Sequence, residues 1–120
     1  MALKELEDAT AVEDFLSRHT PVLLYIGPGG RDQQADTVLT SLCALAPARS
    51  AAWVRPYEGV ADRYVRQLLT HLPQTDRACL VLIEGAVVLD VLRSTDVEAH
   101  GEEWAKAHFG ERFLARLSES

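Results

Sequence analysis

Runs of large apolar residues mark the strands of a predicted sheet. The run Val22–Ile26 is apolar throughout, which is typical of a central strand that helices cover on both faces. The cluster Gly27-Pro28-Gly29-Gly30 directly after it predicts a sharp end to this strand. Further strands are predicted at Leu3–Leu6, Ala51–Val54, Ala78–Ile83 and Val87–Leu92. The last two are separated by little more than Glu84-Gly85, so they are expected to form an antiparallel hairpin.

Between these strands, apolar residues recur every three or four positions, as they do on one face of a helix. Helices are therefore predicted at Ala11–Arg18, Asp32–Leu45 and Gly59–Leu72, and from Thr95 into the C-terminal region. Thr10 with Glu13, and Thr95 with Glu98, fit the capping-box pattern that marks a helix start.

The resulting order is β-α-β-α-β-α-β-β-α over residues 1–120, which predicts a single domain. The early strands need crossovers through helices, and only the last pair can form a hairpin. This predicts an α/β fold, a three-layer α/β/α sandwich with a mixed central sheet. Trp53 and Trp104 are expected to anchor its core.

Composition and charge narrow the classes of partner. The chain has 120 residues, of which 48% are hydrophobic and 25% charged, a balance typical of a globular protein. Its formal net charge of −6 repels nucleic acids and anionic membranes, so neither is an expected partner. No apolar run approaches the roughly 18 residues of a membrane helix, and the acidic N-terminus shows no secretory signal. A cytoplasmic location is expected.

The sulfur and imidazole groups do not form a metal-binding pattern. Cys43 and Cys79 belong to no Cys-x-x-Cys pair, and both are expected to be reduced and mostly buried. The histidines are scattered, and His100 and His108 lie too far apart to act as neighbouring ligands on one helix. We therefore expect neither a metal nor a cofactor.

The order of elements and the closing hairpin, Leu-Val-Leu-Ile-Glu-Gly-Ala-Val-Val, resemble the thioredoxin-like superfamily over nearly the whole chain. Active thioredoxins carry Trp-Cys-Gly-Pro-Cys in the loop before the long helix, where a low-pKa thiolate attacks a disulfide. Here that loop is Gly27-Pro28-Gly29-Gly30-Arg31-Asp32, and Ala78 stands where the family has a cis-proline. The resemblance therefore implies a thioredoxin-like domain without dithiol chemistry.

The candidate binding residues lie where this family meets its substrates: Gly27, Pro28, Gly29, Gly30, Arg31, Tyr57, Arg77 and Cys79. The glycine loop with Arg31 has two open interpretations, an anion site built from backbone N–H groups or a tight turn. It lacks the Gly-Lys-Ser/Thr ending of a phosphate loop. Tyr57 is either an interface aromatic or a loop-packing residue, and Cys79 is either a lone reactive thiol or a small buried side chain.

Three hypotheses follow. The first is a redox-inactive domain that binds another protein as an adaptor, assembly factor or maturation chaperone, as the thioredoxin-like hydrogenase-maturation proteins do. The second is a thiol-dependent or glutathione-type oxidoreductase that uses Cys79 with the Gly27–Arg31 loop. The third is a homodimer that pairs through Val87–Leu92 or through the final helix.

Overall fold

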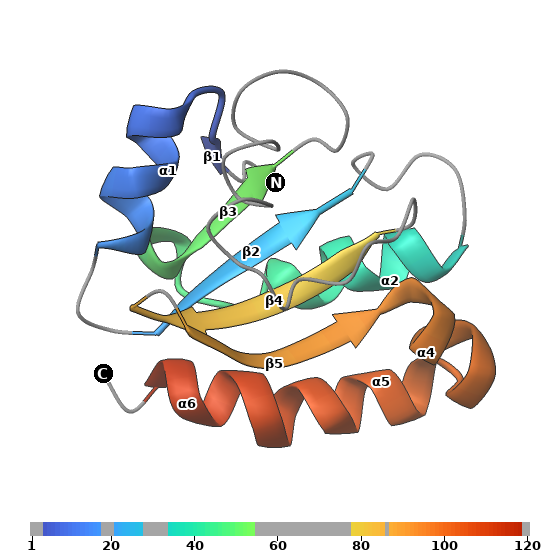
Figure 1. The fold of residues 1–120 in the computed structure, drawn as a ribbon. Helices are drawn as coiled ribbons and strands as arrows, with labels where there is room; N and C mark the ends of the chain where they lie inside the picture. The colour runs from blue at the N-terminus through green and yellow to red at the C-terminus, as the bar shows by residue number, and fades with distance from the viewer. Residues whose placement is uncertain (1–3, 18–20, 28–33, 55–77, 86, 119–120) are drawn as a thin grey trace.

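The apolar runs lie side by side as the strands of one mixed sheet (Figure 1). The computed structural model describes residues 4–17, 21–27, 34–54, 78–85 and 87–118. Its strands are β1 (Lys4–Glu5), β2 (Val22–Ile26), β3 (Ala51–Val54), β4 (Cys79–Glu84) and β5 (Val87–Arg93). They are arranged in the order β1-β3-β2-β4-β5. The β1–β3 and β3–β2 pairs are parallel, whereas β2–β4 and the β4–β5 hairpin are antiparallel.

Helices cover both faces of this sheet, so the predicted mixed α/β class is confirmed (Figure 1). One face carries α1 (Ala9–Leu16). The other carries α2 (Gln34–Cys43), α4 (Ser94–His100), α5 (Glu102–Phe109) and α6 (Ala115–Ser118). A 3-10 turn, η1 (Ala48–Ser50), leads into β3. The helix predicted at Gly59–Leu72 lies outside the described residues.

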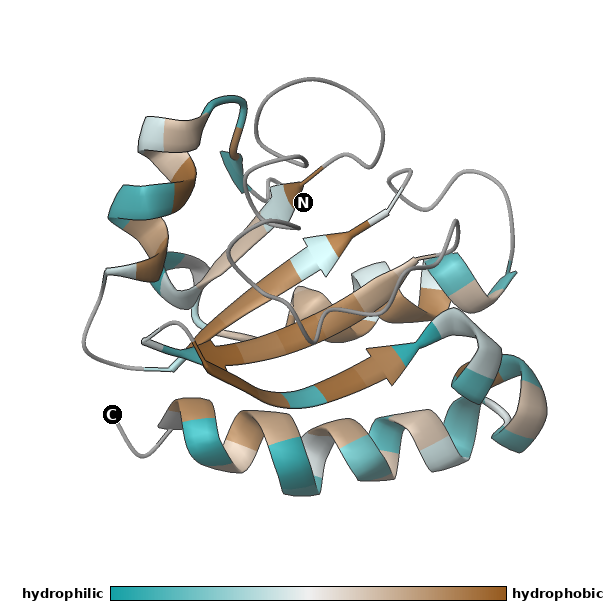
Figure 2. Ribbon diagram, in the orientation of Figure 1, coloured by the Kyte–Doolittle hydropathy of each residue, from teal (hydrophilic) through white to brown (hydrophobic). Residues whose placement is uncertain are grey.

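The sheet separates two hydrophobic cores. Successive side chains of a strand point to opposite faces, and β4 follows this rule: Leu80 and Leu82 face α2, whereas Cys79 and Val81 face α1. We call these the α2-side core and the α1-side core. Figure 2 shows the same division, with apolar strands between helices that are apolar on one side. The apolar runs of β2 and β4 thus follow from burial on both faces.

Both predicted helix caps are wrong by a few residues. The N-cap of α1 is Asp8, whose Oδ1 accepts a hydrogen bond from the Ala11 N–H at 2.8 Å, and Thr10 lies inside the helix. The helix α4 begins at Ser94, before Thr95. There Asp96 Oδ2 accepts a hydrogen bond from the Arg93 N–H at 3.0 Å. In both cases an aspartate carboxylate satisfies the backbone N–H that was assigned to a threonine cap.

The C-terminal helix runs from α5 through one turn of π-helix, η2 (Gly110–Leu114), into α6. Its buried residues Ala105, Phe109, Phe113 and Leu117 are spaced by four, and the Phe109 and Phe113 rings stack at 5.3 Å. In a regular α-helix a spacing of four drifts by about 40° per step. A π-turn holds more residues per turn, so it reduces this drift and keeps the apolar stripe on the sheet.

Two hydrophobic residues assigned to helix stripes are exposed instead. Trp104 is 36% exposed and lies between the rings of His100 and His108, at centroid distances of 4.4 and 4.9 Å. Gly101 ends α4 and starts α5 at this point, so one helical stripe cannot run through both helices. Leu45 is 62% exposed because α2 ends at Cys43. Trp53, by contrast, packs half-buried against the α2-side core.

The strand β5 forms one edge of the described sheet, but its edge is guarded. The β4–β5 register shifts between Leu82 and Ile83, which leaves Leu89 as an extra residue on β5. Next to this bulge, Asp90 Oδ1 accepts a hydrogen bond from the Val91 N–H at 2.9 Å. The other carboxylate oxygen lies 3.5 Å from Arg112 Nη1. A bulge and a charged residue are devices that discourage strand addition, which weakens the hypothesis of a dimer through Val87–Leu92.

Replacing Asp90 by valine is expected to promote self-association. The Asp90→Val change frees the Val91 N–H and removes the charge from the edge. Light scattering should then show a mass that rises with concentration more steeply than for the unsubstituted chain. Asp90→Asn is the control, because its amide oxygen still accepts the hydrogen bond; losing the ion pair should cost at most about 1 kcal/mol. Equal masses for all three proteins would contradict the guarding role.

Candidate functional site

The end of β2 is held on both sides of Gly27. The Gly27 N–H donates to the carbonyl oxygen of Val54 at 3.3 Å, which extends the pairing with β3. The Gly27 carbonyl oxygen accepts a hydrogen bond from Trp53 Nε1 at 2.7 Å. Trp53 is thus fixed by its indole N–H at the point where the candidate loop begins.

Gly27 is required by packing. A Cβ atom at this position would lie 2.5 Å from the hydroxyl oxygen of Tyr25 and 2.8 Å from the Cβ of Ala78. Two strands and a tyrosine ring therefore meet closely here, and only a residue without a side chain fits. The glycine that the sequence assigned to a turn thus also closes the core.

The Tyr25 hydroxyl forms a buried hydrogen bond with the Asp36 carboxylate. Tyr25 is 1% exposed and Asp36 is 3% exposed, and Asp36 lies in the first turn of α2. The bond ties the start of this helix to the central strand. Sequence reasoning missed this pair, although Asp36 shares a helical stripe with Leu39 and Cys43, where a charged residue signals a buried polar partner.

The predicted site residues are only partly brought together. Gly27 and Cys79 are described, whereas Pro28, Gly29, Gly30, Arg31, Tyr57 and Arg77 lie outside the described residues. Cys79 pairs in register with Ile26, one residue before Gly27. Its side chain, however, is 2% exposed and belongs to the α1-side core, whereas Tyr25 and Ala78 belong to the α2-side core. The Cys79 thiol is therefore directed away from the Gly27 corner.

Cys43 is the second thiol, and it is also enclosed. It lies in α2, is 0% exposed and packs in the α2-side core. Burial raises the pKa of this thiol from 9.0 to about 12, because the thiolate would lose its hydration. Neither cysteine is in a disulfide, and the sheet lies between the two sulfur atoms. They cannot form a dithiol pair in this fold.

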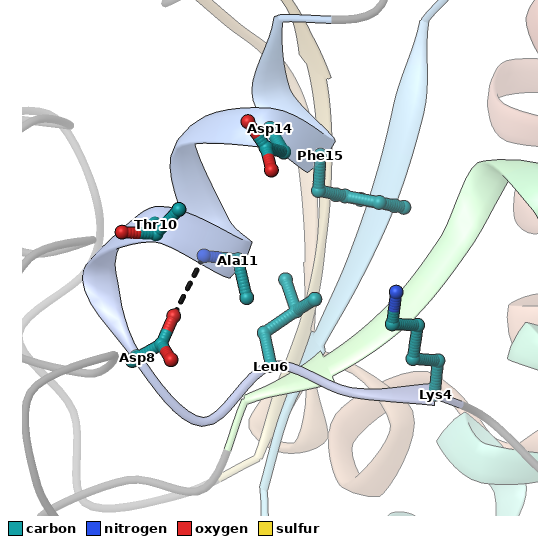
Figure 3. Close-up of a pocket in the computed structure, with 7 residues that line it drawn as sticks. All are labelled: Lys4, Leu6, Asp8, Thr10, Ala11, Asp14 and Phe15. Carbon is teal, nitrogen blue, oxygen red and sulfur yellow. Dashed lines mark hydrogen bonds between the residues drawn. The ribbon is translucent and has the colours of Figure 1, made fainter.

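Described residues line three hollows on the surface. One, of about 300 Å³, lies between β1 and α1, where Leu6 and Phe15 form the apolar side and Lys4 and Asp14 lie at the rim (Figure 3). Another, of about 320 Å³, lies beside the β5 bulge and contains Arg112 and Arg116 together with acidic residues. The third, of about 240 Å³, lies between α2 and the α4–α5 corner. The first two combine both signs of charge, whereas the third has only acidic charges in its lining.

Comparison with known proteins does not assign this site. No protein-family model matches the chain, and no curated protein matches it. Within the described residues, no group of three or more His, Cys, Asp or Glu side chains is arranged to hold a metal ion. None of the described helices is long and apolar enough to cross a membrane. Function must therefore be argued from the thiols, the Gly27 corner and the hollows.

Substituting Gly27 by alanine should destabilise the fold. The new Cβ would overlap the Tyr25 hydroxyl and the Ala78 side chain, and such overpacking typically costs about 1–3 kcal/mol. Gly110→Ala is the matched control, because nothing lies within 4 Å of a Cβ there and the backbone is helical. It should be neutral or stabilise by up to about 1 kcal/mol. Urea unfolding measures both, and equal effects would refute the packing argument.

The Cys43 thiol should make stability fall at high pH. The unfolded chain ionises this thiol with its ordinary pKa of 9.0, whereas the folded chain keeps it protonated up to about pH 12. Its contribution to the free energy of unfolding is therefore full below about pH 9 and is lost as the pH rises toward 12, by at most about 1.4 kcal/mol per pH unit. Urea unfolding at about pH 8 and about pH 10 should show this loss, and Cys43→Ala should lack it. A slope unchanged by the substitution would exclude Cys43 as its cause.

Proposed function

We propose that this chain is a redox-inactive thioredoxin-like protein that acts by binding another protein, as an adaptor, assembly factor or maturation chaperone. The arrangement of the described strands supports the family assignment. A β-α-β unit and a crossover through α2 precede an antiparallel β4–β5 hairpin and a C-terminal helix, the order from which the resemblance was drawn.

The placement of the sulfur atoms carries the proposal. Dithiol chemistry needs two thiols that can approach each other, one of them an exposed thiolate at low pKa. Cys43 and Cys79 are both buried on opposite sides of the sheet, and burial raises the Cys43 pKa to about 12. The scaffold has been kept while the reactive pair is missing, and a scaffold without chemistry is best explained by binding.

The rival oxidoreductase hypothesis needs Cys79 to act with the Gly27–Arg31 loop. Cys79 is 2% exposed and its side chain packs against Val81 and Ile26 in the α1-side core. The Gly27 corner contacts Tyr25 and Ala78 on the other side of the sheet. No described contact therefore favours a reactive Cys79 over a structural one.

The described surface offers groups that suit a protein partner. Trp104 is 36% exposed between two imidazole rings, and tryptophan is among the residues most enriched at the energetic centres of interfaces. The hollow between α2 and the α4–α5 corner adds a concave surface. These features support binding as the mode of action.

A thiol assay tests this proposal. With dithiothreitol as reductant, the chain should not accelerate insulin reduction above the rate of the Cys43→Ala/Cys79→Ala variant, whereas a thioredoxin with a Cys-x-x-Cys pair should accelerate it strongly. Iodoacetamide at neutral pH should leave both thiols unmodified until urea unfolds the chain. Insulin reduction that depends on Cys79, or rapid alkylation of native Cys79, would overturn the proposal in favour of the rival.

A further inference from the structure

The hollow between α2 and the α4–α5 corner has an apolar floor. Ala35 and Val38 come from α2 and Val97 comes from α4, and each of these side chains is 5% exposed. The walls are formed by Gln34, Glu98, Gly101 and Glu102. The hollow thus offers a greasy base of small side chains beneath a polar rim.

The shape of the rim depends on Gly101. Its φ of +94° is a conformation that residues with a side chain rarely adopt, and it ends α4 and starts α5 at a corner. Glu98 precedes this corner and Glu102 follows it, and both carboxylates belong to the same wall. Two negative charges therefore lie on one side of an apolar floor.

No basic residue lines this hollow. Lys106, one turn further along α5, lies 4.0 Å from Glu102 and 3.9 Å from Glu103, and all three side chains are at least half exposed. Such exposed pairs are weak and screened by salt, so Lys106 offsets the charge of the rim only in part. The other two hollows contain Lys4 or the arginines of the C-terminal helix.

We propose that this hollow receives an arginine or lysine side chain of the partner protein. The aliphatic stem of such a residue covers the floor at Val38 and Val97 while its charged head meets Glu98 and Glu102. A volume of about 240 Å³ suits a single long side chain. This inference rests on the proposed function, since it names the chemistry of the bound protein.

Other occupants fit less well. A bare divalent cation would leave the apolar floor uncovered and would find few of the oxygen ligands it needs. A second copy of this chain has a net charge of −6 itself, so two copies repel each other before contact. A purely apolar side chain would leave the two carboxylates unused. Charge and shape together favour a cation on an aliphatic stem.

Amide NMR on the isotope-labelled full chain tests the proposal with small probes. N-acetyl-arginine amide should cause saturable shifts at Val38, Val97 and Gly101, with a dissociation constant on the order of 1 mM. N-acetyl-norleucine amide, which keeps the stem without the charge, should bind about fivefold more weakly or not at all. Shifts without saturation, or equal affinity for both probes, would overturn the proposal.

Charge-neutral variants locate the effect. Glu98→Gln/Glu102→Gln should lower the affinity for the arginine probe about fivefold, as expected for the loss of exposed ion pairs. Glu103→Gln/Glu111→Gln removes the same charge from glutamates that do not line this hollow, and should change the affinity little. Equal losses in both variants would reduce the effect to net charge and refute a specific site. The spectrum of each variant without probe reports that it is folded.

The two proposals fail separately. Thiol-dependent insulin reduction would overturn the proposed function whatever the probes do. Inert thiols together with an arginine probe that does not bind would leave the redox-inactive class in place and remove only this hollow as its contact surface.

Discussion

The hydrogen bond between the Tyr25 hydroxyl and the Asp36 carboxylate holds together the parts of the molecule that meet at the end of β2. A carboxylate buried to this degree is costly unless it is hydrogen-bonded, and an unsatisfied polar group at such a place costs about 1–3 kcal/mol. The bond fixes the start of α2 against the central strand. Gly27 and Ala78 then close around the tyrosine, so that β2, β4 and α2 share one junction.

From this junction, the central sheet divides the chemistry of the chain. Each core receives one sulfur atom, and neither core shares it with the other. A fold that in other proteins brings two thiols to one corner here keeps them apart and protonated. What remains available to a partner is surface, chiefly the exposed Trp104 and the acidic hollow beside α2. The case for binding therefore comes from the interior as much as from the exterior.

Burial patterns could be predicted from the sequence, and partnerships could not. The bounds of Val22–Ile26 and Ala51–Val54 are confirmed as β2 and β3, because an unbroken apolar run has few alternatives. Trp104 was misplaced, because helical spacing was followed across a glycine that breaks the helix. Tyr25 and Asp36 lie eleven positions apart, and their bond appears only once strand and helix are packed. The acidic hollow likewise needs the α4–α5 corner to exist first.

The π-turn between α5 and α6 bears on how the gene for this protein can change. The stripe from Ala105 to Leu117 stays on the sheet because η2 changes the helical phase at Gly110–Leu114. Codons for similar residues can be exchanged along this stretch without disturbing that phase. Losing or gaining a single codon there would rotate everything that follows by about 100°, turning Leu117 toward solvent and charged residues toward the core. The helix should therefore vary by substitution among related sequences while its length in this region stays constant.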